Sequence, residues 1–255
     1  MASADEFQEI FRRSIEELRA IVAWMNAMEQ TGKIPSVTVL FGGWAVYAYN
    51  PWYESIDIDL ITNSDVKNQL MRYLIAARQY ARDSSEPPST VVKYVKTAGG
   101  RGDIRLDFVS RTTSYPFEGK RVALDFSNLG DHTVLKEISE GLSFRVPERS
   151  LLLIYKLKAV SDRSYRIRAG RSNFPEREAS KLFKDYCDVL ALIDRKQYAD
   201  DLDIRIIAEA LARYDFLADI LNELPGHKDE IGRYRRMKSD EVATVCRDLA
   251  LLTKK

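Results

Sequence analysis

The first part of the chain alternates between helical and strand-like patterns of apolar residues. Apolar side chains recur with a period near 3.6 from residue 3 to residue 30, and Ser3 and Glu6 have the spacing of a capping box. Gly32 is expected to end this helix. Further helices are predicted at residues 44–49 and 65–82, the latter capped by Asn63 or Ser64. Strands are predicted at residues 37–41, 57–61, 91–96, 104–109, 121–125 and in parts of 132–144, a loop at 84–89 and a turn at 99–100.

The pattern becomes helical near Val146 and stays helical to the end of the chain. Pro147 is expected at the first position of a helix, where its missing N–H costs no hydrogen bond. The predicted helices are residues 148–163, 176–195, 203–221 and 240–253. We therefore predict an α/β (α+β) fold, in which a mixed β-sheet flanked by helices (residues 1–146) is followed by a helical domain (residues 147–255).

Composition narrows the class of protein only slightly. The chain has 255 residues, of which 45% are apolar and 30% charged, as in an ordinary globular protein. It has no apolar run of membrane-spanning length and no signal-peptide pattern, so we expect a cytoplasmic protein with no membrane association. Cys187 and Cys246 form neither a disulfide framework nor a metal-ligand spacing. The formal net charge of +1 does not by itself favour a nucleic-acid partner.

The candidate chemistry lies in the predicted sheet. Alternation along a strand places Asp57 and Asp59 on one face, where two carboxylates repel each other unless a cation lies between them. Asp107, on a neighbouring strand, would add a third carboxylate, and three converging carboxylates suit Mg²⁺. Two such ions would stabilise the attacking and leaving oxygens of a displacement at phosphorus. Gly42 and Gly43 would let the backbone approach a triphosphate closely, at the start of a helical turn.

Each of these features also has an ordinary structural explanation. A Gly-Gly pair after a strand is usually only a turn, and an Asp-x-Asp strand can simply face solvent. Asp107 alone has little specificity, and Asp103 lies on the same predicted strand face, so either residue can be the third ligand. The functional interpretation depends on all the features occurring together in this order.

The order of these motifs resembles the DNA polymerase β-like nucleotidyltransferase superfamily. The matching features are Gly-Gly, thirteen intervening residues, Asp-Ile-Asp-Leu, and a later strand with an aspartate between apolar residues. The resemblance implies that Asp57, Asp59 and Asp107 bind two Mg²⁺ ions and that Asp107 helps to activate the acceptor hydroxyl. Gly-Gly in place of Gly-Ser resembles the branch of abortive-infection toxins from type IV toxin–antitoxin systems and related small-molecule transferases. The segment Glu54-Ser55-Ile56 lacks the Arg or Thr of many relatives, which leaves the details of the substrate open.

The helical half extends the same resemblance. Lys156 and Arg163 lie two helical turns apart on one predicted face, and Lys184-Asp185-x-x-Asp188 follows on a later helix. This resembles the toxin-type pattern in which a helical lysine contacts the NTP phosphates and an aspartate on a later helix positions it. The resemblance assigns these roles first to Lys156 and Asp185, and then to Lys184 and Asp188, while Arg163 is a candidate because it shares a helix face with Lys156. The alternative is that these charges form only the solvated face of a helix.

Residues 161–180 form an arginine-rich segment with interleaved aromatic residues. Gly170 and Pro175 suggest a loop, and Tyr165 and Phe174 accompany the arginines. Arginine forks match phosphate geometry and aromatic rings stack on bases, so a mobile basic loop would hold a triphosphate or an RNA acceptor. A disordered, solvated connector explains the composition equally well.

The sequence thus predicts a Mg²⁺-dependent nucleotidyltransferase that moves a nucleoside monophosphate from an NTP to an acceptor. By resemblance, the acceptor is RNA (tRNA) or a protein hydroxyl, the activity is toxin-like, and the partner is a cognate antitoxin. One alternative is a transferase for aminoglycoside-like or lincosamide-like antibiotics, which needs an enclosed acidic acceptor pocket. Another is a catalytically silent module that binds a nucleotide or a protein.

Overall fold

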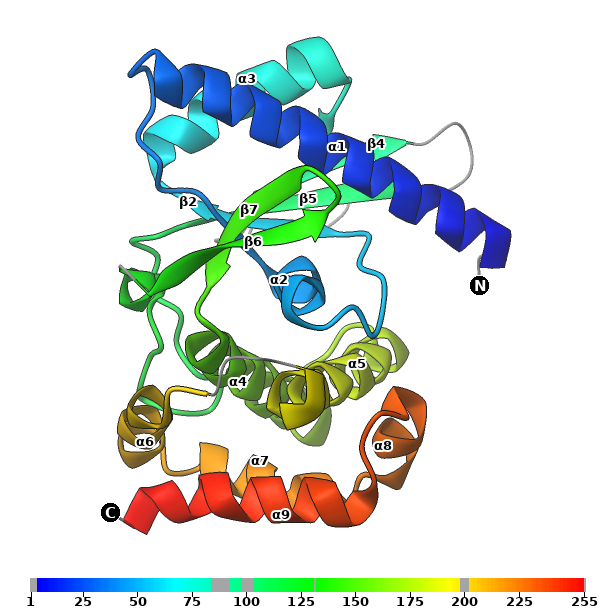
Figure 1. Cartoon of the computed structure of the whole chain (residues 1–255), viewed down its shortest axis with the longest axis vertical. Helices are drawn as coiled ribbons and strands as arrows, with labels where there is room; N and C mark the ends of the chain where they lie inside the picture. Colours follow the sequence, from blue (N-terminus) through cyan, green and yellow to red (C-terminus); the bar gives the residue numbers. More distant parts are fainter. Residues whose placement is uncertain (1–3, 84–91, 98–102, 131, 198–201, 255) are drawn as a thin grey trace. The chain divides into compact units, whose positions relative to one another are not determined.

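The computed structural model describes residues 4–83, 92–97, 103–130, 132–197 and 202–254 (Figure 1). The chain divides into two compact units. The sheet unit consists of Met1–Thr113 and Asp125–Pro147, and the helical unit of Ser114–Leu124 and Glu148–Lys255. Helices accompany a mixed sheet, which confirms the predicted α+β class.

The sheet unit is built around a five-stranded sheet with the order β1-β2-β5-β4-β3. Its β1 and β2 are antiparallel, β2 and β5 are parallel, and the pairs β5–β4 and β4–β3 are antiparallel. A separate hairpin, β6–β7, completes the unit. The elements are α1 (Ala4–Gln30), β1 (Val39–Phe41), α2 (Gly42–Tyr49), β2 (Ile58–Thr62), α3 (Ser64–Arg78), β3 (Ala81–Arg82), β4 (Val92–Thr97), β5 (Asp103–Ser110), the 3₁₀ helix η1 (Phe126–Leu129), β6 (Thr133–Ser139) and β7 (Leu142–Pro147).

Strand alternation separates a core face of the sheet from a polar face. Ile58 and Leu60 of β2 are fully buried, as are Leu106 and Phe108 of β5, whereas the aspartates between them are half-buried. Burial of these four side chains contributes about 1.5–3 kcal/mol each. The sheet is therefore held by its apolar face, and the half-buried aspartates lie on the opposite face, where Ile61 is also buried.

The N-terminal helix is attached to the sheet unit by a buried carboxylate. Glu17 of α1 is 3% exposed and accepts hydrogen bonds from Arg78 at 2.8 Å and from Lys96 at 2.6 Å. A buried carboxylate needs such cations, because desolvation alone would strongly disfavour its charge. Leu18 and Ile21 in the apolar stripe of α1 are fully buried, as its period predicts.

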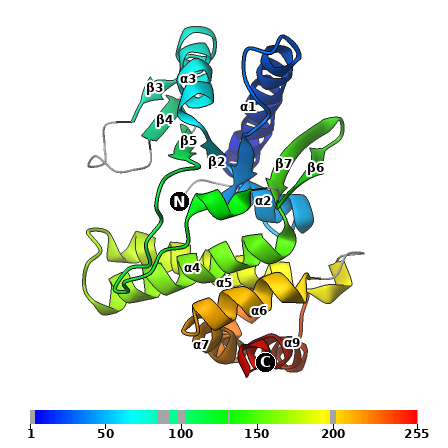
Figure 2. The same ribbon diagram turned by 90° about the vertical axis from the view of Figure 1, so that its left-hand side faces the viewer.

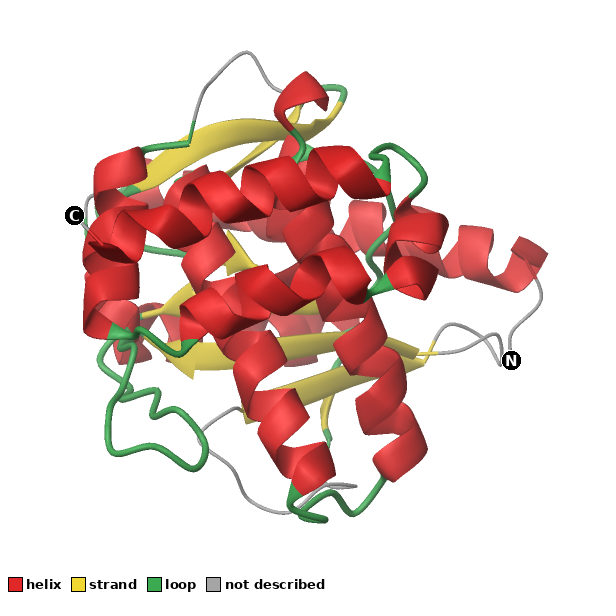
Figure 3. Cartoon of the chain, turned by 90° about the horizontal axis from the view of Figure 1, so that it is seen from below, coloured by secondary structure: helices red, strands yellow, loops and turns green. Residues whose placement is uncertain are grey.

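The helical unit consists of helices joined mostly by short loops (Figure 3). Its longest members, α4 and α5, pack against each other along much of their length (Figure 2). The elements are α4 (Arg149–Arg168), α5 (Pro175–Ile193), η2 (Arg195–Gln197), α6 (Ile204–Arg213), α7 (Leu217–Glu223), η3 (Leu224–Gly226), α8 (Lys228–Tyr234), α9 (Ser239–Ala250) and η4 (Leu251–Lys254).

The segment Ser114–Leu124 belongs to the helical unit although it follows β5 in the chain. The fully buried ammonium of Lys158 on α4 donates a hydrogen bond to the Pro116 carbonyl at 2.8 Å. At the other end of the segment, the Tyr214 hydroxyl donates to the Ala123 carbonyl at 2.6 Å. These bonds satisfy backbone groups that have no strand partner, which fixes the segment to the helices.

The structure differs from the sequence prediction at two helices and at Pro147. The helix predicted to reach residue 82 ends at Arg78, because Gln79 adopts a left-handed conformation (φ 62°) and β3 follows. The helix predicted over residues 203–221 is split into α6 and α7. Pro147 is the last residue of β7 and pairs with Thr133, so its predicted place at the start of a helix is wrong.

One predicted strand and one predicted loop also differ in the structure. Residues 121–125 form no strand and contribute only an isolated bridge between Pro116 and Ala123. The loop predicted within residues 161–180 is confined to residues 169–174, between α4 and α5. The predicted N-cap Ser3, the loop at 84–89 and the turn at 99–100 lie outside the described residues. Among the helices that the structure describes, none combines the length and apolar character needed to cross a bilayer.

Candidate functional site

The register of the central strands places two of the predicted carboxylates side by side. β2 and β5 are parallel neighbours, and Asp59 pairs with Asp107 across them. Neighbouring strands lie about 4.8 Å apart, and paired residues project from the same face. Both aspartates are half-buried, between fully buried apolar neighbours. Asp57 is half-buried as well and comes immediately before β2.

The same register separates the two candidates for the third carboxylate. Asp103 is the first residue of β5, is exposed, and pairs with Thr97 of β4. The pairing with β2 begins only at Leu106. Four residues along a strand correspond to about 13 Å, so Asp107, and not Asp103, lies beside Asp59.

A lysine that the sequence analysis did not single out faces the pair from the other side. Lys93 of β4 is the antiparallel partner of Asp107 and is half-buried. The polar face thus has the order Asp59, Asp107, Lys93 across three strands, so the cation lies beside Asp107 and one strand further from Asp59. Alternation alone does not reveal Lys93, because its position depends on which strands pair.

The first turn of α2 lies directly against Asp59. Gly42 has φ 62°, and a Cβ added there would overlap the Asp59 carboxylate, whose Cγ is only 2.8 Å from that position. Phe41, the preceding residue, pairs with Asp59 in the β1–β2 ladder and provides no side-chain cap for α2. Glycine is therefore required at residue 42 by backbone conformation and by space. Gly43 follows within the same turn and does not have positive φ.

These features fit a divalent cation bound together with a phosphate substrate. In the described part of the chain, no three His, Cys, Asp or Glu residues come close enough to form a complete protein cage for a metal. Mg²⁺ usually takes only one or two carboxylates and completes its shell with water and substrate phosphates. The paired carboxylates of Asp59 and Asp107, beside a helix start that anions favour, match that type of site.

The residues predicted on the two long helices meet in a buried ion cluster of the helical unit. Lys156 of α4 is 7% exposed, and its Nζ donates to Asp188 at 2.7 Å and to Asp185 at 3.3 Å. Arg163 donates to Asp185 at 2.6 Å, and Lys184 donates to Asp188 at 3.2 Å. All five predicted residues therefore belong to one cluster.

The charges within this cluster stabilise one another against desolvation. Burial opposes the charge of Lys156, but Asp188 and Asp185 outweigh it and raise the pKa of the ammonium. Burial also opposes the charge of Asp185, yet Lys156, Arg163 and Lys184 lower the pKa of this carboxyl. Because Asp185 and Asp188 are 6% and 1% exposed, the interpretation as a solvated helix face is wrong for them.

Two glutamates that the sequence analysis missed extend the cluster along α4. Glu178 of α5 accepts from Arg163 at 2.8 Å and also pairs with Arg166, which in turn pairs with Glu118. Glu178 had a local signal, since it lies on the helix that carries Asp185. Glu118 had none, because it comes from the segment Ser114–Leu124, far from α4 in the sequence.

Trp44 is a packing residue rather than a substrate contact. It is completely buried and stacks on Phe11, with ring centroids 5.4 Å apart and an interplanar angle of 11°. Tyr47 meets its edge at 5.4 Å. The aromatic cluster thus fixes α1 to α2 and supports the turn at Gly42 from behind.

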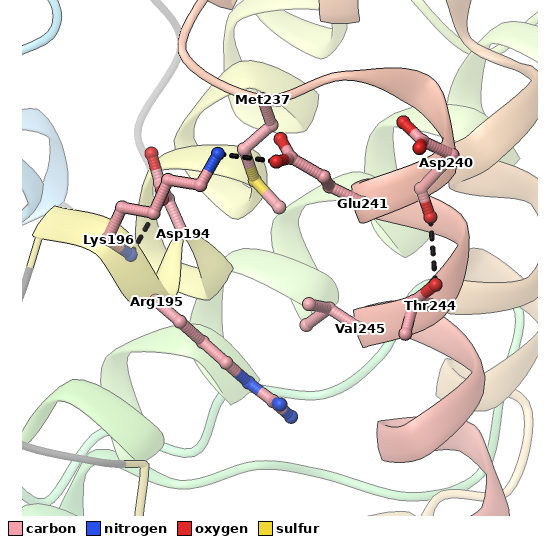
Figure 4. A pocket seen from close by; sticks show the side chains of 8 residues that line it. All are labelled: Asp194, Arg195, Lys196, Met237, Asp240, Glu241, Thr244 and Val245. Carbon is pink, nitrogen blue, oxygen red and sulfur yellow. Dashed lines mark hydrogen bonds and ion pairs between the residues drawn. The ribbon is translucent and has the colours of Figure 1, made fainter.

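A cavity of about 290 Å³ in the helical unit contains none of the predicted site residues (Figure 4). It lies between η2 and α9, and Met237 and Val245 form part of its apolar wall. The ion pair between Lys196 and Glu241 joins its two sides (Figure 4). Asp194 is already engaged by the Tyr234 hydroxyl at 2.7 Å. These polar groups satisfy one another, so we assign no chemistry to the cavity.

Comparison with known proteins adds no family assignment. No protein-family model matches the chain, and no curated protein matches it. The functional interpretation therefore depends on the contacts described above and on the resemblance of the motifs.

Proposed function

We propose that the chain is a Mg²⁺-dependent nucleotidyltransferase that moves a nucleoside monophosphate from an NTP to an acceptor hydroxyl. The observation that carries the proposal is the in-register pair of Asp59 and Asp107 beside the first turn of α2. Two adjacent carboxylates repel each other, and Lys93 supplies one positive charge beside Asp107, so a bound divalent cation would complete the charge balance. A helix start next to them favours the anionic groups of the nucleotide.

The candidate site residues of the sheet unit would each have a defined role in the proposed reaction. Asp59 and Asp107 would hold the divalent cation, and the bound cation would neutralise charge on the triphosphate. The acceptor oxygen forms a bond to the α-phosphorus, and the bond from that phosphorus to the β-phosphate oxygen breaks. Asp107 would accept the proton of the acceptor hydroxyl, and pyrophosphate leaves. Gly42 and Gly43 would let the triphosphate approach the backbone.

The cations of the helical unit are candidates for phosphate contact by resemblance alone. By resemblance, Lys156 contacts the NTP phosphates and Asp185 positions it, and Arg163 and Lys184 are further candidates for phosphate contact. The side chains of Arg163 and Lys184 are 21% and 33% exposed, whereas that of Lys156 is 9% exposed. We therefore assign direct contact first to Arg163 and Lys184, and we assign Lys156 to the positioning of both aspartates.

The acceptor and the biological role rest on the motif resemblance alone. We propose RNA or a protein hydroxyl as the acceptor, a toxin-like activity, and a cognate antitoxin as partner. Expression of the chain in a bacterial host tests the toxin-like role. Growth arrest is expected with the intact chain, but not with Asp59→Asn.

A transfer screen tests the proposed chemistry. The purified chain is incubated with each of the four NTPs labelled at the α-phosphate, Mg²⁺, total RNA and a protein extract. Label on a macromolecule is expected with the intact chain and is expected to be lost in Asp59→Asn. Asp103→Asn is the matched control, since it removes a carboxylate from β5 away from the pair, and its transfer should be unchanged. If an antibiotic is added and only the antibiotic is labelled, the acceptor is a small molecule and not a macromolecule. If NTP is bound but no label is transferred, the result supports a catalytically silent module.

A further inference from the structure

A surface of the helical unit joins two segments that are distant in the sequence. The turn at residues 117–121 packs on the C-terminal end of α4 (Figure 2). Gly119 has φ 72°, and a Cβ there would overlap the Tyr165 ring, whose Cδ2 is 2.7 Å from that position. The turn is also held by the backbone N–H of Glu118, which donates to Asp162 at 2.9 Å. We call the turn and residues 165–174 together the tip surface.

The tip surface carries cations that have no carboxylate partner. Lys120, Arg121, Arg168 and Arg171 are exposed, and none of them forms an ion pair with any residue the structure describes. The guanidinium of Arg171 lies 5.4 Å from the centre of the Tyr165 ring, which brings it next to the turn. Arg163 and Arg166, five and two residues before Arg168 on α4, differ in that carboxylates match their charges, and one of these carboxylates is Glu118 of the turn.

An exposed aromatic ring accompanies these cations. Phe174 is 64% exposed and lies directly before α5, at the end of the short loop that contains Arg171. The loop gains little stability from a phenylalanine that remains in water, because the ring buries little apolar area. An exposed apolar ring in the same loop as an unmatched arginine is a combination that binds bases by stacking and phosphates by charge.

We propose that the tip surface binds single-stranded nucleic acid. Lys120, Arg121, Arg168 and Arg171 would contact successive phosphates, and a base would stack on Phe174. A duplex has its bases already stacked and would leave Phe174 without a partner. That the bound strand is the acceptor of the transfer rests on the proposed function. The binding itself requires neither NTP nor catalysis.

Binding of labelled oligonucleotides tests this inference. Fluorescence anisotropy is measured without NTP for 16-nucleotide oligouridine and oligodeoxythymidine, and for an RNA duplex, over a range of salt concentrations. The double variant Arg168→Ala/Arg171→Ala is expected to weaken binding of the single strands at least tenfold. The slope of log affinity against log salt should fall by about 0.7 for each lost phosphate contact. Phe174→Leu is expected to weaken binding about fivefold or more with the slope unchanged, because stacking is not ionic.

A matched control removes the same charge from the opposite end of α5. Arg195 and Lys196 follow this helix of 19 residues, so they lie about 28 Å from its N-terminal end. Arg195→Ala/Lys196→Ala should leave binding within about twofold of the intact chain. Circular dichroism checks that every variant is folded.

Three results would overturn the inference. Equal weakening by the control and by the tip variant would show that net charge, and not this surface, binds the oligonucleotide. Equal affinity for the duplex together with no effect of Phe174→Leu would exclude base stacking. Binding to vesicles of anionic phospholipid through Arg168 and Arg171, with none to either single strand, would identify a membrane surface instead. Oligonucleotide binding without any transfer would refute the transferase and leave the tip surface intact.

Discussion

Replacing Gly42 with alanine is expected to destabilise the sheet unit and displace Asp59. The left-handed conformation of Gly42 (φ 62°) costs a residue with a side chain about 1–2 kcal/mol. The added Cβ also overlaps the Asp59 carboxylate, because the distance between this Cβ and the Asp59 Cγ would be only 2.8 Å. Overpacking of this kind costs about 1–3 kcal/mol more, so the sum is about 2–5 kcal/mol.

Gly141 supplies the control for the backbone part of this cost. It has φ 66° and no atom within 4 Å of an added Cβ, so Gly141→Ala should cost only about 1–2 kcal/mol. The free energy of unfolding is measured in urea for both variants, and for Gly42→Ala combined with Asp59→Ala. Removing the carboxylate should recover about 1–2 kcal/mol as a coupling energy. If Gly42→Ala costs no more than Gly141→Ala while Asp59 is present, the close approach of Gly42 and Asp59 is wrong.

Three further predictions concern the helical unit. Lys156→Met should lower the free energy of unfolding by about 3–5 kcal/mol, because Asp185 and Asp188 lose a shared cation in a buried site; a loss below about 1 kcal/mol in urea would argue against this role. Although burial opposes its charge, neighbouring cations lower the folded-state pKa of Asp185, so its stabilising contribution is present above about pH 4 and is lost as the pH falls below that value. Acid unfolding followed by circular dichroism should accordingly depend less on pH in Asp185→Asn, and an unchanged pH dependence would contradict the assignment. Burial raises the pKa of Cys187 and Cys246 to about 12, so a thiol reagent at pH 8 should label neither until the chain is unfolded, and rapid labelling of the native chain would refute this.

Local patterns in the sequence predicted the conformation around the candidate site correctly. The alternation at Asp57-Ile58-Asp59 identified β2 and the face that carries Ile58, because successive side chains of a strand point to opposite faces of the sheet. The position of Gly42 between a strand and a helix was also visible, since glycine marks a backbone that other residues avoid. These features depend on neighbouring residues in the chain, and a single sequence contains them.

Pairings between distant segments could not be predicted in the same way. The parallel register of Asp59 with Asp107, and the place of Lys93 beside it, depend on the order of strands in the sheet. Periodicity gives the face of each strand but not its neighbour, so Asp103 and Asp107 were equivalent until the register was known.

The buried ion cluster was identified by its residues but not by its burial. A helical pattern separates polar from apolar positions, and it cannot distinguish a solvated aspartate from one that a lysine of another helix neutralises. Lys156 and Asp188 are buried, although the helical pattern was equally compatible with a solvated face. Gly170 and Pro175 suggested a loop between residues 161 and 180, but arginine is a good helix former, and Glu178 stabilises the helical arrangement through Arg166.

Binding of Mn²⁺ tests the central claim most directly, because it does not depend on the identity of the acceptor. Electron paramagnetic resonance measures the affinity of the intact chain for Mn²⁺ in the presence of a non-hydrolysable NTP analogue. If Asp59 and Asp107 hold the divalent cation, Asp107→Asn should weaken Mn²⁺ binding at least tenfold, and Asp103→Asn, from the same strand, should leave it unchanged. Unchanged binding in Asp107→Asn, or a larger loss in Asp103→Asn, would contradict the assignment of this pair as the metal site.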